Sequence, residues 1–145
     1  MRNGTVEHIS RHKRIVLFFL ADPFVSRARA FLQTEPVGLL VSNSVSAEFA
    51  SVIARRVRMK LLSTDEARVA FSNFDTWVER ATTRIEALAA DVRTAEAILR
   101  RLDLTLRTPD ALNIAIAQRA NAFLATLDAR MAESAGILGT QVSAL

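Results

Sequence analysis

Cysteine is absent from this chain of 145 residues, and glycine and proline occur only 4 and 3 times. Without cysteine, a disulfide scaffold, a thiolate metal site and a redox centre built on thiols are excluded. The scarcity of glycine and proline, with a hydrophobic content of 50%, argues against disorder and for a compact globule. We therefore expect a single domain, residues 1–145, in a reducing compartment, the cytoplasm.

The N-terminal region lacks a hydrophobic run that is long enough to cross a bilayer. A basic and imidazole-rich cluster, His8–Arg14, precedes the apolar run Ile15–Ala21, an order that secretion signals share. The run stops at Asp22, however, and no small-residue cleavage site follows directly. It is also far too short for a membrane span. We expect neither a secretion signal nor a membrane protein.

Histidine is scarce, and both histidines, His8 and His12, lie in the basic cluster, where we expect them to be solvated rather than to bind metal. The net charge of +4 comes mostly from arginine. The planar guanidinium group suits phosphate recognition, because it donates two parallel hydrogen bonds. The charge therefore favours a nucleic acid or an acidic protein as partner, with an ordinary solvated surface as the alternative.

Strand and helix signals alternate along the chain. The apolar runs "VGLLV" (37–41) and "AFLAT" (122–126) predict buried strands, "TTRIEAL" (82–88) predicts a third, and the tail "TQVSAL" an edge strand. Helical periodicity predicts helices between them. Such alternation is typical of an α/β fold, with a short parallel sheet of about four to five strands and helices on both faces.

Several residues predict where the helices begin. Ser44 or Ser46 is expected to cap the helix after "VGLLV", and Ser63 has the spacing of a capping box with Glu66. In "RTPDALNIAIAQRAN", Thr108 is expected at the N-cap, with proline at the first helical position. That helix is apolar almost all round apart from its asparagine, so it should be buried. The phenylalanine and tryptophan stripe at 71–77 should be core rather than a base-stacking platform.

Three acidic residues are expected where ligands gather in such folds, outside the carboxyl ends of the strands. Glu48 lies early in the helix after "VGLLV", Asp110 in the first turn of the buried helix, and Asp128 directly after "AFLAT". Each also has a structural explanation, because acids complement helix dipoles and aspartate caps helices. Together, oxygen-only ligands favour Mg²⁺ or Mn²⁺, which activates water for phosphodiester cleavage.

From Ile15 onward the chain resembles the PIN-domain ribonucleases, specifically the VapC-type toxins of VapBC toxin–antitoxin systems. The pieces that carry the resemblance are "LFFLADPF", "SAEFASVIARRV" and "LRTPDALNIAIAQRANAFLATLDARM", in that order. The resemblance implies a three-layer PIN fold and a divalent-metal-dependent endoribonuclease that cleaves RNA. It also implies a homodimer and inhibition by a small cognate antitoxin.

The resemblance further implies catalytic and metal-binding roles for Glu48, Asp110 and Asp128, and a supporting role for Thr126. The family pattern has one more aspartate, at the end of the first strand. An ungapped count back from "VLFFLADP" places it at Arg11. On this alignment "HISRHKR" replaces the first strand and "IVLFFLADPF" is the first helix. The nearest acids, Glu7 and Asp22, are misplaced.

Arg11 leaves three hypotheses open. It weakens Mg²⁺ binding by pointing into the acidic site, it points outward and leaves a weak three-acid site, or it blocks the cleft from within. Residues 1–14 are either a divergent first strand or a poorly ordered leader. A misassigned start or an early frameshift would produce the same pattern.

Three functions from different classes are consistent with the sequence. The first is a Mg²⁺-dependent endoribonuclease toxin. The second is a pseudo-nuclease with the same fold that dimerises and binds an antitoxin but cuts nothing. The third is a mostly helical regulatory domain that binds nucleic acid through arginine-rich faces, which requires "VGLLV" and "AFLAT" not to be strands.

Overall fold

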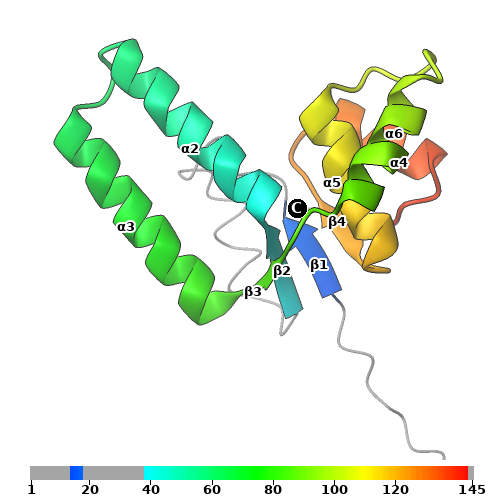
Figure 1. Cartoon of the computed structure of the whole chain (residues 1–145), viewed down its shortest axis with the longest axis horizontal. Coiled ribbons are helices and arrows are strands. Elements are labelled where there is room, and N and C mark those ends of the chain that lie inside the picture. The colour runs from blue at the N-terminus through cyan, green and yellow to red at the C-terminus, as the bar shows by residue number, and fades with distance from the viewer. Residues whose placement is uncertain (1–13, 18–37, 144–145) are drawn as a thin grey trace, which may run out of the picture.

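Five parallel strands form one sheet in the order β3-β2-β1-β4-β5 (Figure 1) in the computed structural model, which describes residues 14–17 and 38–143. The central strand β1 pairs with β2 on one side and β4 on the other, and Ile15 is in register with both Leu39 and Phe123. The strands are β1 (Arg14–Leu17), β2 (Gly38–Ser42), β3 (Thr83–Ile85), β4 (Phe123–Ala125) and β5 (Val142–Ser143). Because "VGLLV" and "AFLAT" both contribute strands, the mostly helical alternative is excluded.

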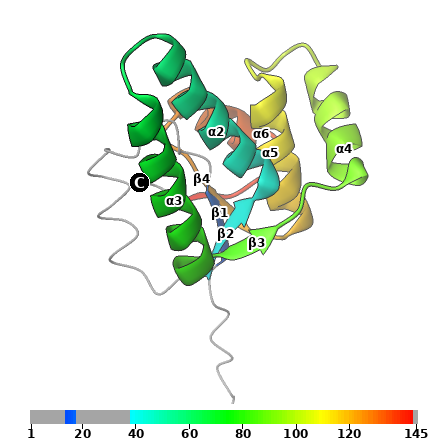
Figure 2. The same ribbon diagram turned by 60° about the vertical axis from the view of Figure 1, so that its left-hand side comes forward.

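Helices flank the sheet on both sides, as the alternation predicts. In both views α3 lies on one side of the strands and α4 on the other (Figures 1 and 2). None of the helices in the described part of the chain is long and apolar enough to cross a membrane. The helices are α2 (Asn43–Arg58), α3 (Thr64–Ala81), α4 (Ala89–Leu99), α5 (Thr108–Arg119) and α6 (Ala129–Ile137).

The prediction of a first helix over "IVLFFLADPF" is wrong for its first three residues. Ile15–Leu17 belong to strand β1, and residues 8–13 and 18–24 lie outside the described residues. Isoleucine and valine are β-branched and favour strands. Between β2 and β4 this segment also pairs its backbone on both edges, which satisfies polar groups at the centre of the sheet.

Two helix starts differ from the expected ones by a residue or more. Ser42, rather than Ser44 or Ser46, caps α2, because β2 runs into the helix without a loop and the Val45 N–H donates to Ser42 Oγ at 3.0 Å. Helix α5 begins at Thr108 with Arg107 at the N-cap, one residue earlier than expected.

The capping box that begins α3 is confirmed. The Glu66 N–H donates to Ser63 Oγ at 3.1 Å, and the Ser63 N–H donates to Glu66 Oε2 at 2.7 Å. The two reciprocal bonds satisfy backbone donors that the first turn leaves without partners.

Two clusters of buried residues lie within the described part of the chain. In the larger, α5 lies at the centre, and Ile114 and Ile116 are fully buried among residues of β2, β4, α4 and α6. The smaller joins α2 to α3, where the rings of Phe49 and Phe74 stack with their centroids 4.3 Å apart. Phe71 and Phe74 are half-buried against this cluster, which confirms for these two residues the prediction of core packing. The two clusters fix α2 and α5, the helices that carry Glu48 and Asp110.

Candidate metal centre

Glu48 and Asp110 form an acidic pair at the starts of two neighbouring helices. Glu48 lies in the second turn of α2, and Asp110 is the third residue of α5. Glu48 Oε1 and Asp110 Oδ1 are both buried, and neither oxygen has a hydrogen-bond partner among residues 14–17 and 38–143. Buried acceptors without partners are rare and cost free energy, so these two oxygens suit a bound cation or water.

The surroundings of Glu48 make its ionised form unfavourable. Burial raises the pKa of Glu48 from 4.5 to about 7, the negative charge of Asp110 adds to the rise, and the positive charge of Arg107 opposes it. Glu48 therefore changes its charge near neutral pH in the absence of a metal ion. A cation that binds both carboxylates would displace this proton.

Asp110 is held in place by the start of its own helix. Its Oδ2 accepts a hydrogen bond of 2.8 Å from the Arg107 backbone N–H, which is the N-cap of α5. The Arg107 guanidinium lies farther off, with 3.8 Å between Nε and the same Oδ2. The cap thus uses one carboxylate oxygen, Oδ2, and leaves the other, Oδ1, without a hydrogen bond among the described residues.

A buried polar network connects the two helices beneath the acids. Ser42 and Asn113 are fully buried, and Ser42 Oγ donates to Asn113 Oδ1 at 3.4 Å. Asn113 Nδ2 donates to the Pro109 carbonyl at 2.9 Å. Since Ser42 caps α2 and Pro109 lies in the first turn of α5, the network couples the position of Glu48 to that of Asp110.

Asp128 does not form a group with Glu48 and Asp110. It is exposed and caps α6, because its Oδ1 accepts from the backbone N–H groups of Arg130 at 2.9 Å and Met131 at 3.3 Å. Buried Thr126 supports the same turn by accepting a hydrogen bond from the Asp128 N–H at 3.1 Å. Within residues 14–17 and 38–143, no three acidic or histidine side chains group closely enough to hold a metal ion.

Comparison with known proteins identifies the family. The model of the PIN domain matches residues 15–137, which is most of the chain. The chain belongs to the PIN domain family. A search of curated proteins by sequence finds no match.

Two solved structures resemble this PIN domain along nearly its whole length. VapBC2 from Rickettsia felis, bound to a DNA fragment from their promoter, matches with a TM-score of 0.63 and 14% identity, and covers 90% of this chain and 97% of that chain. FitAcB from Neisseria gonorrhoeae matches with a TM-score of 0.61 and 17% identity, and covers 90% and 96%. At these identities the likeness is one of fold.

The acid pair of this PIN domain fits a hard divalent cation. Both buried, partner-free atoms are carboxylate oxygens, the ligand type that Mg²⁺ and Mn²⁺ prefer. Mg²⁺ commonly binds through only one or two carboxylates and keeps several waters. Glu48 and Asp110 are therefore sufficient as a minimal protein contribution, and further ligands would be waters and substrate oxygens.

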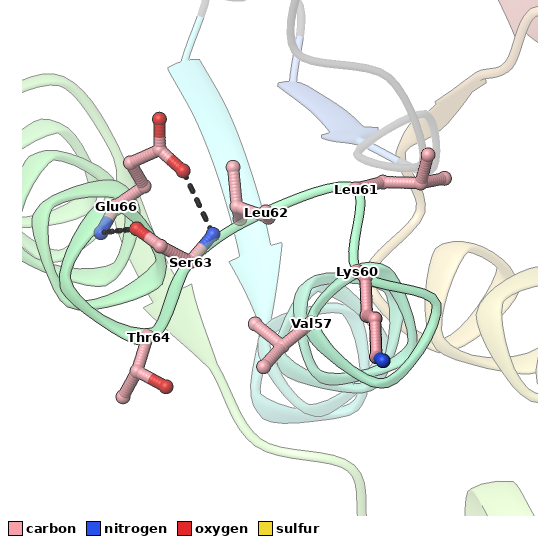
Figure 3. A pocket seen from close by; sticks show the side chains of 7 residues that line it. All are labelled: Val57, Lys60, Leu61, Leu62, Ser63, Thr64 and Glu66. Carbon is pink, nitrogen blue, oxygen red and sulfur yellow. Dashed lines mark hydrogen bonds between the residues drawn. The ribbon is translucent and has the colours of Figure 1, made fainter.

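Two open hollows lie elsewhere on the PIN domain. One, of about 420 Å³, is at the turn between α2 and α3, where Glu66 is committed to the Ser63 cap (Figure 3). The other, of about 560 Å³, lies between α3 and β3 and is lined by Asp75, Glu79 and Arg84. Neither of these two hollows is lined by Glu48 or Asp110.

The sequence did not single out two residues at the centre, Ser42 and Arg107. Asn113 carried a signal, because it is the polar exception in an otherwise apolar helix. No feature of the sequence distinguished Ser42 from Ser44 and Ser46. Arg107 resembled any other exposed arginine until the fold placed it beside the acids.

Proposed function

We propose that this PIN domain is a divalent-metal-dependent endoribonuclease and the toxin of a type II toxin–antitoxin pair. The observation that carries the proposal is the Glu48–Asp110 pair, with one buried, partner-free oxygen on each carboxylate. The fold likeness to VapBC2 and FitAcB supports the toxin assignment. The net charge of +4 suits an RNA substrate.

Glu48 and Asp110 hold Mg²⁺ or Mn²⁺ in this proposal. When bound, such an ion polarises the phosphodiester and activates a water. The Ser42–Asn113 hydrogen bond joins the start of α2 to α5, and the Arg107 N–H holds Asp110 Oδ2 at the start of α5. Asp128 is proposed to support the ion through water, because no three acids of the described residues group closely enough to bind one ion directly. Both of its hydrogen bonds use Oδ1, which leaves Oδ2 for such a water.

The proposed partners follow from the same assignment. A small cognate antitoxin would inhibit the enzyme, and two copies of the chain would form a homodimer. Size-exclusion chromatography with light scattering tests the dimer. Co-expression with the product of the adjacent reading frame tests the antitoxin.

RNA cleavage by the purified chain tests the nuclease. The double variant Glu48→Gln with Asp110→Asn should reduce Mn²⁺-dependent cleavage by at least about a hundredfold, because the ion loses both carboxylates. The matched control is Asp75→Asn with Glu79→Gln, which makes the same two changes in exposed residues of α3. Cleavage that survives the first double variant would exclude the proposed site.

A catalytically impaired PIN domain that still dimerises and binds an antitoxin is the second candidate. It is favoured by the commitment of Asp128 to the α6 cap and by the absence of a three-acid group among the described residues. Stable complex formation with an antitoxin, without cleavage in either Mg²⁺ or Mn²⁺, would support it. Metal-dependent cleavage that the double variant abolishes would rule it out.

Arg11 is a weaker discriminator between these candidates than the ungapped count implied, because that count ended the first strand before Ile15, whereas β1 is Arg14–Leu17. Arg11 lies outside the described residues, three positions before the first residue of β1, whereas the ungapped count expects it at the end of a strand. If residue 11 is the position at which the family has its additional aspartate, Arg11→Asp should tighten Mg²⁺ binding and increase cleavage. Equal Mg²⁺ affinities of the two proteins in calorimetry would show that residue 11 does not contribute to the site.

A further inference from the structure

The Arg107 side chain is exposed and only loosely paired, although it lies beside buried charge. Its side chain is 84% exposed, and its Nε is 3.8 Å from Asp110 Oδ2, without a hydrogen bond from the guanidinium to any described residue. By contrast, three other arginines hold their acids at 2.8 Å, namely Arg100 with Glu96, Arg101 with Asp103 and Arg119 with Asp91. The guanidinium of Arg107 therefore has its donors available.

The fold uses the backbone of Arg107 and not its side chain. The Arg107 N–H donates to Asp110 Oδ2 at 2.8 Å, and its carbonyl accepts from the Ala111 N–H at 3.1 Å. Both bonds survive any side-chain substitution other than proline. A requirement for arginine at this position would therefore come from what the guanidinium binds.

Resting on the proposed function, we propose that Arg107 is a substrate-binding residue that contacts the scissile phosphodiester of RNA next to the Glu48–Asp110 pair. It is placed for this role at the exposed rim, within reach of the acid that would hold the metal. Its planar fork matches two phosphate oxygens, which a lysine ammonium does not.

The charges around the pair make this contact conditional on the metal. Without a cation, the positive charge of Arg107 lowers the pKa of Glu48 and so stabilises its ionised form. A divalent ion competes for the same negative charge and repels the guanidinium. Arg107 then turns to the phosphate, where it adds positive charge at the site at which negative charge develops during cleavage.

The test compares Arg107→Gln and Arg107→Lys in the full chain. Arg100→Gln is the matched control, because it removes an arginine that is also exposed, at 79%, and is paired away from the acids with Glu96. Mn²⁺ affinity is measured by calorimetry. RNA affinity is measured by fluorescence anisotropy with a short single-stranded phosphorothioate RNA, which resists cleavage, in Mn²⁺ and in EDTA.

Arg107→Gln should bind Mn²⁺ about three- to tenfold more tightly, because a competing cation is gone. Its RNA affinity in Mn²⁺ should fall about tenfold or more, and by less in EDTA. Arg107→Lys keeps the positive charge, so its Mn²⁺ affinity should stay close to that of the wild type. Its RNA affinity should fall in part, because the planar fork is lost. The opposite signs distinguish a binding residue from a structural one, since damage to the fold would lower both affinities.

Unchanged RNA affinity in Arg107→Gln, or an equal loss in Arg100→Gln, would overturn the assignment of Arg107. Lower Mn²⁺ affinity in Arg107→Gln would overturn it too, because it would make the side chain a support for the acids. Failure of the proposed function has a different signature: Glu48→Gln would then bind Mn²⁺ as well as the wild type.

Discussion

Asp91 and Asp110 begin two helices in the same way and have different surroundings. Each is the third residue of its helix, is nearly fully buried, and accepts a hydrogen bond of 2.8 Å from the N-cap backbone N–H, that of Leu88 or Arg107. The second oxygen of Asp91 accepts from Arg119 Nε at 2.8 Å. The second oxygen of Asp110 is buried without a partner and lies near Glu48 instead.

The comparison separates a structural acid from one that we propose to bind a metal ion. Arg119 also donates to the Glu86 carbonyl at 2.7 Å, so the Asp91 pair fastens α4 to α5 and to the segment before α4. The pairing raises the pKa of Arg119 further above its usual range. Asp110 has the same helix position but a second acid as neighbour, which destabilises the metal-free fold and prepares the site for a cation.

The largest expected difference is in metal binding and cleavage. Asp110→Asn should reduce Mn²⁺-dependent RNA cleavage by at least about a hundredfold, because a neutral amide is a poor ligand for a hard cation. The amide oxygen still accepts the Arg107 N–H, so helix α5 should begin at the same residue. Asp91→Asn should leave Mn²⁺ affinity within about twofold of the wild type. Equal losses in the two variants would remove the distinction.

In unfolding by denaturant, Asp91→Asn should have a larger effect on stability than Asp110→Asn, the reverse of their order in metal binding and cleavage. Asp91→Asn should lower the free energy of unfolding by about 2 kcal/mol, because Arg119, whose side chain is 33% exposed, loses its charged partner. Asp110→Asn should leave stability unchanged or raise it, since repulsion with Glu48 is relieved. The comparison would fail if Asp110→Asn proved the more destabilising variant.

The pH dependence of the free energy of unfolding tests whether the ionised form of Glu48 destabilises the metal-free fold. Because the folded-state pKa of Glu48 is raised to about 7, the folded protein binds that proton more tightly than the unfolded chain. The stabilisation of the folded state by this proton is complete below the ordinary pKa of 4.5 and is lost as the pH rises towards 7. In EDTA, Glu48→Gln should therefore be about 1 kcal/mol more stable than the wild type at about pH 8, allowing for solvent screening.

The control for that measurement is the same variant at about pH 5, where wild-type Glu48 is already protonated and the difference should nearly vanish. A constant difference at both pH values would assign the effect to packing rather than to charge. Adding Mn²⁺ should reverse the order at about pH 8, since only the wild type gains the metal ligand.

The smallest expected effect on stability is at Asp128, the cap of α6. Asp128→Ser keeps a side-chain oxygen at the N-cap, so the free energy of unfolding should change by no more than about 0.5 kcal/mol. If Asp128 supports the ion through water, cleavage should still fall about tenfold or more. Asp128→Ala is the paired variant, which should also lose about 1 kcal/mol of stability. Wild-type cleavage in Asp128→Ser would limit Asp128 to its cap.

The elements and the core were largely predictable from the chain. The apolar runs at 37–41 and 122–126 and the Ser63–Glu66 capping box report local preferences that the fold retains. The first strand was not predictable, because an apolar run flanked by arginine suits a helix or a strand equally. Pairing on both edges with β2 and β4 decided it for Arg14–Leu17.

The candidate site was predictable in its residue types and only partly in its grouping. Glu48 and Asp110 lie close enough for the charge of Asp110 to raise the pKa of Glu48, whereas Asp128 caps α6. Only the tertiary structure places Arg107 and Ser42 near the acids, since nothing in the neighbouring sequence distinguishes them. Their roles depend on how closely α2 and α5 approach, which packing of the apolar core sets.

By itself the sequence determined that Asp91 and Asp110 begin helices, because an acid near a helix start satisfies backbone N–H groups within its own turn. The tertiary structure decided what each does beyond that. Asp91 meets Arg119 from the end of α5, and Asp110 meets Glu48 from α2. A carboxylate beside a guanidinium becomes a structural pair, whereas a carboxylate beside another carboxylate favours a cation. Which of these arises depends on packing between helices, because the local sequence around the two aspartates does not encode it.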